Sequence, residues 1–260
     1  MAKMGIFFRV FGKRESMEYK ALSEAEAAEF EEFQRTRREA EAELTLKKLI
    51  IDASKRETDR HALNAACDLA KRLNAYAVLV SPVNVSAARR RLGESECTIA
   101  CIVGGTGESI MPIKQKEAKR AMAQGAGEIR LIPCYSALFS GNSVYLKREI
   151  KKVRRVVKRC RLVLSLDDHA LTKEEIERGM HAAAEGKADG VSVRGEANLA
   201  ITAVRFSAGR LQVAASGVEN AEQMRLLIEA GVQFALTGNG EELSEEMYRI
   251  MLGRRKGEET

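Results

Sequence analysis

Several residue types and sequence patterns are rare or absent here, and each absence argues against a class of protein. It has no tryptophan, only three histidines, and no apolar run of about 18 residues, so a transmembrane helix is not expected. The five cysteines are an odd number, lie far apart and form no C-x-x-C pair, so they indicate neither a disulfide framework nor a zinc ribbon. The first 13 residues lack the cleavage site of a secretory signal. We therefore expect a cytoplasmic protein with no metal and no cofactor.

The composition is that of a globular chain. Of 260 residues, 45% are hydrophobic and 31% are charged. Lysine and arginine number 43 and aspartate and glutamate 37, and the resulting charge of +6 permits an anionic ligand without requiring nucleic acid. No linker rich in proline, glycine or serine divides the chain, and no G-x-G-x-x-G follows the first expected strand.

Short apolar runs alternate with amphipathic stretches along most of the chain. The apolar runs are Leu49–Ala53, Ala77–Val80, Thr98–Val103, Glu128–Ile132, Leu162–Leu166, Gly190–Val193, Leu211–Ala215 and Phe234–Leu236. The helical patterns are Arg60–Leu73, Gln115–Gln124, Val144–Arg159, Lys173–Glu185, Ala221–Glu229, Glu242–Met251 and, more weakly, Glu196–Arg205. Eight short strands that alternate with about eight helices favour a closed (β/α)8 TIM barrel, with a doubly wound open sheet as the alternative.

Residues Glu15–Glu43 are rich in alanine, glutamate and arginine and contain no glycine or proline, which predicts one or two helices before the first strand. We therefore expect an N-terminal helical extension over residues 1–45 and a barrel over residues 46–260.

Functional residues of such barrels lie at the C-terminal ends of the strands. The candidates there are Asp52, Lys55, Arg130, Asp167, His169, Ser192, Arg194, Ser216, Gly217, Thr237 and Gly238.

Several segments, taken in order, resemble the deoxyribose-phosphate aldolase family of (β/α)8 barrels. The strongest is GAGEIRLIPCYSALFSGN at Gly125–Asn142, with SPVNVSAARRRLG at Ser81–Gly93 and AASGVENAEQM at Ala214–Met224. The resemblance extends from about Leu46 to Leu252. It implies the TIM-barrel fold and, because family members often self-associate, a possible homo-oligomer.

The same resemblance places other residues where the family has its catalytic ones. Ser192 stands where the family has the lysine that forms an imine with the aldehyde, Val213 where it has a second lysine, and Arg130 where it has a proton-transferring aspartate. An imine requires an amine nucleophile, and arginine does not titrate near neutral pH. We therefore expect a non-aldolase that binds a phosphorylated or carboxylated small molecule, or a changed chemistry, rather than the family's retro-aldol reaction.

The expected binding residues each have an alternative role. Arg130 and Arg194 are expected to face the barrel and hold the anion, or else to pair with Asp52 or Asp167 and fill the site. Ser192, Asp167 and His169 would form a polar wall, although the segment after Asp167 also carries a helix-capping pattern at Thr172 and Glu175. The loops at Ser216–Gly217 and Thr237–Gly238 would bind phosphate through N–H groups, or be ordinary turns. Glu219 would oppose such an anion.

Two further functions remain open. A relocated lysine, Lys55, would make the chain an active lyase on a phosphorylated aldol. The basic run Lys147–Arg161 would make it an interaction or regulatory protein, but its apolar stripe predicts the solvated outer face of a barrel helix, so nucleic acid is not the expected partner. Lys114, in the helical pattern after the third strand, is also expected to face water.

Overall fold

The computed structural model describes residues 24–167 and 171–252 of the chain. Eight strands form a closed barrel in chain order, each parallel to its neighbours, and β8 pairs with β1. The strands are β1 (Leu49–Ala53), β2 (Ala77–Val80), β3 (Thr98–Val103), β4 (Glu128–Leu131), β5 (Arg161–Ser165), β6 (Gly190–Arg194), β7 (Gln212–Ser216) and β8 (Phe234–Thr237). The closed barrel confirms the predicted (β/α)8 fold and excludes the open sheet.

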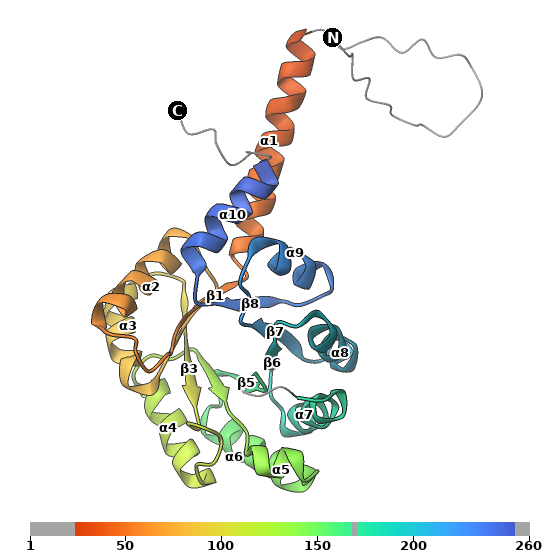
Figure 1. Cartoon of the computed structure of the whole chain (residues 1–260). Helices are drawn as coiled ribbons and strands as arrows, with labels where there is room; N and C mark the ends of the chain where they lie inside the picture. The colour runs from red at the N-terminus through yellow and green to blue at the C-terminus, as the bar shows by residue number, and fades with distance from the viewer. Residues whose placement is uncertain (1–23, 168–170, 253–260) are drawn as a thin grey trace, which may run out of the picture.

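Helices surround the barrel between the strands (Figure 1). They are α1 (Glu24–Leu46), α2 (Arg60–Arg72), α3 (Val85–Leu92), α4 (Met111–Ala123), α5 (Tyr135–Phe139), α6 (Ser143–Val156), α7 (Lys173–Gly186), α8 (Ala197–Ser207), α9 (Ala221–Glu229) and α10 (Gly240–Leu252), with a 3-10 turn η1 (Pro82–Asn84). The weakly predicted helix α8 is confirmed. The short helices α3 and α5 are additions that the periodicity did not indicate.

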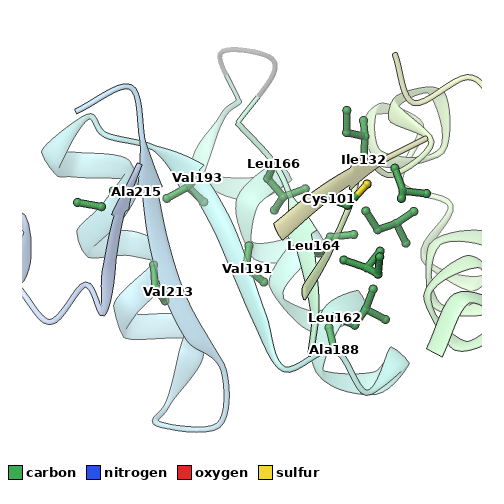
Figure 2. Packing of buried hydrophobic residues seen from close by; sticks show 14 of the residues in the cluster. Cys101, Ile132, Leu162, Leu164, Leu166, Ala188, Val191, Val193, Val213 and Ala215 are labelled. Atoms are coloured by element: carbon green, nitrogen blue, oxygen red, sulfur yellow. The ribbon is translucent and has the colours of Figure 1, made fainter. Parts of the chain in front are cut away.

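Alternate residues of each strand face opposite sides of the barrel wall. The outward set packs against the helices in the main hydrophobic core, which includes Val191, Val193, Val213 and Ala215 (Figure 2). The inward set has only a small apolar cluster around Ile50 and Leu236. Val163 and Ala214 also face inward, beside Arg130 and Ser192 in the register. The candidate site lies among the polar residues of this inward set.

Helix α1 lies beside α10, and its first half extends away from the barrel (Figure 1). Ala42 and Leu46, near its C-terminal end, are buried in the main core. The single helix over Glu24–Leu46 occupies most of the range predicted to be helical. The extent of the extension, residues 1–45, stays a prediction.

Two local predictions have clear outcomes. The capping box at the start of α7 is confirmed, because the Glu175 N–H donates to the Thr172 hydroxyl at 3.3 Å and the Thr172 N–H donates to the Glu175 carboxylate at 2.7 Å. The predicted apolar stripe of the basic segment is also present, since Ile150 and Val153 of α6 are buried in the main core.

The expectation that Lys114 faces water is wrong. Its side chain is fully buried, and its Nζ donates to the carbonyls of Gly107 at 2.7 Å and Ile132 at 3.0 Å. It also forms an ion pair with Glu149 of α6 at 2.7 Å. Helix α4 begins at Met111, four residues before the predicted start, and Glu149 supplies the opposite charge that allows a lysine to be buried.

Candidate functional site inside and above the barrel

A chain of hydrogen bonds runs through the barrel interior from β4 to the end of β5. Arg130, which is 1% exposed, donates from Nε to Glu128 Oε1 at 2.8 Å and from Nη1 to Ser192 Oγ at 3.2 Å. Ser192 donates to Asp167 Oδ2 at 2.8 Å, and Ser165 donates to Asp167 Oδ1 at 2.6 Å. Because β4 and β6 are not neighbours, the contact between Arg130 and Ser192 crosses the interior of the barrel.

At the Glu128 end of this series of hydrogen bonds, a second arginine, Arg161, interacts with the same carboxylate. Arg161 Nε lies 3.7 Å from Glu128 Oε2, which also accepts from the Tyr76 hydroxyl at 2.9 Å. The Arg161 guanidinium lies 5.3 Å from the Tyr76 ring centroid and 5.2 Å from that of Phe234, and it donates to Gln212. Burial, together with the nearby Glu128 carboxylate, raises the pKa of Tyr76, so the phenol stays neutral.

The partner of Arg130 differs from the two that the sequence suggested. Asp52 instead accepts from the backbone and hydroxyl of Ser54, at 2.9 Å and 2.6 Å, and Asp167 meets Arg130 only through Ser192. Glu128 takes the role because residues two apart on a strand face the same side. The sequence Glu128-Ile129-Arg130 in β4 therefore already indicated this ion pair.

Arg194 lies at the mouth of the barrel rather than inside it. It is the last residue of β6, its side chain is 48% exposed, and its Nε lies 3.3 Å from Glu196 Oε1. Its register partner on β7 is Ser216. An arginine with one exposed carboxylate neighbour keeps most of its donors available for a ligand.

The loops after β7 and β8 lie at the same end of the barrel as Arg194, because all eight strands are parallel. Gly217 has a φ of +68°, a conformation that favours glycine, and among the described residues neither its N–H nor that of Gly238 has an acceptor. Thr237 is buried, and its hydroxyl accepts from the Asn239 N–H at 3.1 Å. The Nζ of Lys55 lies 3.3 Å from where a side chain at position 238 would begin. Lys55 therefore reaches across to the β8 loop.

The remaining candidates are placed as follows. Val213 belongs to the outer core, and the interior position opposite Ser192 is held by Ala214. His169 lies outside the described residues. Within residues 24–167 and 171–252, no group of three or more His, Cys, Asp or Glu side chains is arranged to hold a metal ion, and no helix is long and apolar enough to cross a membrane.

Lysine is absent from every strand of the barrel. Among the described residues, the exposed Lys55 in the loop after β1 lies close to the β8 loop at the mouth. The buried Lys114 of α4 also contacts this end of the barrel, through the carbonyls of Gly107 and Ile132, but it is paired with Glu149. The fold and this site define a (β/α)8 barrel with a charge-paired interior and a basic, glycine-bearing mouth.

Comparison with known proteins identifies the family. No model of a protein family matches the chain. It is 30% identical over 212 residues to the deoxyribose-phosphate aldolase of Mycoplasma pneumoniae, covering 77% of this chain and 94% of the relative. It is also 30% identical over 205 residues to that of Thermococcus gammatolerans, covering 74% and 88%. The chain therefore belongs to the deoxyribose-phosphate aldolase family.

Solved structures show the same fold. An aldolase called QR15 superposes with a TM-score of 0.75 at 24% identity, covering 81% of this chain and 99% of that structure. The tetrameric deoxyribose phosphate aldolase from Aeropyrum pernix superposes with a TM-score of 0.74 at 15% identity, covering 86% and 99%.

Proposed function

We propose that this member of the family does not use the imine mechanism and instead binds a phosphorylated or carboxylated small molecule at the barrel mouth. One observation carries the proposal: the interior is occupied by the Arg130–Glu128 ion pair and Ser192, and no strand offers an amine. A carbonyl substrate entering this barrel would meet a guanidinium and a hydroxyl, and neither forms an imine.

The anion is held by the mouth, in this proposal, rather than by Arg130. Glu128 already neutralises Arg130, so its charge offers little to a ligand. Arg194 is exposed beside Ser216. The N–H groups of Gly217 and Gly238, which have no acceptor among the described residues, add neutral donors suited to phosphate or carboxylate oxygens.

In this proposal, the hydrogen bonds that link Arg130, Ser192 and Asp167 inside the barrel position the side chains that meet the ligand. The Ser192 hydroxyl accepts from Arg130 and donates to Asp167, so its direction is fixed. Asp167 is only partly buried, and its carboxylate can accept a further hydrogen bond from a ligand hydroxyl. A molecule with hydroxyl and phosphate groups, such as a sugar phosphate, would place its hydroxyl at Asp167 and its phosphate at Arg194. The predicted contribution of His169 stays part of this proposal.

The test is ligand-dependent stabilisation. A panel of phosphorylated sugars and carboxylated metabolites is added to the protein and to the variants Arg194→Ala and Arg205→Ala, the latter an exposed arginine on α8. A ligand at 100 times its Kd stabilises the fold by about 2.7 kcal/mol, a rise of several degrees in Tm. We expect Arg194→Ala to abolish the shift and Arg205→Ala to retain it. No shift with any anion, or an unchanged shift in Arg194→Ala, overturns the proposal.

The contact of Lys55 with the β8 loop favours one second candidate. If an amine has moved to the mouth, Lys55 is the residue placed to form an imine, and the chain would be a lyase on a phosphorylated aldol. This candidate predicts a covalent adduct with an aldehyde after reduction, whereas the first predicts none.

We also propose a cytoplasmic location and self-association. All five cysteines are free, four of them are buried, and a reducing compartment suits that state. The tetramer reported for the Aeropyrum pernix aldolase makes a homo-oligomer the expectation for this chain as well.

A further inference from the structure

Helix α6 carries the densest positive charge of the described chain on its outer face. Its inner face packs through Leu146, Ile150 and Val153, which leaves the cations between them facing outward. One cation is a structural exception, because Arg154 turns in to bind Asp189 at 2.7 Å and two backbone carbonyls. The structure therefore separates cations that hold the fold together from cations that do not.

The outward cations line two adjoining hollows of the surface. The first, of about 530 Å³, is lined by Val144, Lys147, Arg148, Lys151, Lys152 and Arg155. The second, of about 460 Å³, shares Arg155 and adds Lys119 of α4 with Lys158 and Arg159, together with two apolar side chains. We call the two hollows together the basic groove. Within residues 24–167 and 171–252, no acidic side chain lines it.

The protein neutralises the basic groove only at one end. Among the described residues, Lys147 alone of these cations has a carboxylate within 4.0 Å, that of Glu185 at 2.7 Å. Like charges recur three and four residues apart, as in Arg148 with Lys152 and Lys151 with Arg155, and such pairs destabilise a helix by about 0.2–0.5 kcal/mol each. The arrangement is thus unfavourable in the free protein and would be relieved by a polyanion.

We propose that the basic groove binds the phosphate backbone of a nucleic acid duplex without reading its sequence. The Cβ atoms of residues four apart on a helix lie about 6 Å from one another, so these cations leave the helix as a row that can meet a row of phosphates. No aromatic side chain of the described residues lines the groove, so these residues give no platform for stacking on unpaired bases, the usual basis of single-strand binding. The sequence predicted a solvated face without a nucleic acid partner, and the present proposal adds a partner to that exposed face.

The experiment is fluorescence anisotropy with labelled 20-base-pair duplexes of two unrelated sequences. We expect both to bind alike, with a Kd of about 10⁻⁶–10⁻⁴ M near physiological salt. If four phosphates are contacted, affinity falls about 100-fold between 50 and 200 mM salt. No binding at 50 mM salt overturns the proposal.

Matched variants locate the surface. Lys151→Glu with Arg155→Glu should weaken binding at least tenfold at 50 mM salt. Arg205→Glu with Arg210→Glu makes the same change in net charge at exposed positions away from the groove and should alter binding less than threefold. Equal losses in the two double variants would refute a localised site. Should the first fail to fold, Lys151→Gln with Arg155→Gln replaces it.

The same binding measurement is repeated with two other kinds of polyanion. A polyglutamate peptide, or vesicles of anionic lipid, that bind as tightly as the duplex overturn the assignment in favour of an acidic protein or a membrane. Stabilisation by small anions at the mouth should be unchanged in Lys151→Glu with Arg155→Glu, so this inference and the proposed function fail independently.

Discussion

The buried ion pair between Glu128 and Arg130 makes a sharp prediction about stability. Glu128→Gln preserves the volume of the side chain, removes its charge and replaces one of its two acceptor oxygens with a donor NH2 group. Arg130, 1% exposed, then keeps a charge in the barrel interior with no carboxylate in direct contact, and Arg161 loses the same partner. Breaking a buried pair on one side costs about 3–5 kcal/mol. We expect a loss of about 3 kcal/mol because the new amide still accepts hydrogen bonds.

The assay is unfolding in urea at neutral pH, with Glu96→Gln as an exposed control expected to change stability by less than about 0.5 kcal/mol. Combining Glu128→Gln with Arg130→Met removes both charges, and stability should recover to within about 1 kcal/mol of the parent. A loss below about 1 kcal/mol in Glu128→Gln, or no recovery in the double variant, would refute the argument that the pair is mutually dependent.

Three other predictions concern the frame around the site. Lys114→Met should cost about 3–5 kcal/mol in urea unfolding, because it leaves Glu149 buried without its cation; a cost below 1 kcal/mol contradicts this. Burial raises the pKa of Cys101 and Cys160 to about 12, so these thiols stay neutral in the fold while unfolded thiols ionise above about pH 9. Stability should therefore fall as pH rises from 9, by roughly 1 kcal/mol per thiol at pH 10, and Cys160→Ala should lessen the fall. Thr172→Ala should cost about 1 kcal/mol through the lost cap of α7, and an unchanged Tm would contradict it.

The strands were readable from the sequence because a buried parallel strand is a short apolar run bounded by polar residues. Every predicted strand is present, with ends displaced by one residue at most. Helices were less complete. The five-residue α5 is too short for a helical period to show, and the start of α4 at Met111 has no capping side chain to mark it.

The site was harder because its key contacts join distant parts of the chain. Arg130 and Ser192 are 62 residues apart, and Tyr76 and Glu128 are 52 apart, so spacing alone could not pair them. Glu128 was an avoidable omission, since strand alternation places it beside Arg130. The burial of Lys114, by contrast, could not be predicted from the sequence. It depends on Glu149, which comes from another helix, and no local pattern encodes that contact.

The central claim is that the barrel offers no amine for imine formation. Its most direct test is intact-mass spectrometry after borohydride reduction in the presence of deoxyribose 5-phosphate, with an active aldolase of the family labelled in parallel. The account predicts that the parallel aldolase gains the mass of the reduced adduct and that this chain gains none. A stoichiometric adduct would contradict it, and one that maps to Lys55 and is lost in Lys55→Arg would support the relocated-lysine candidate instead.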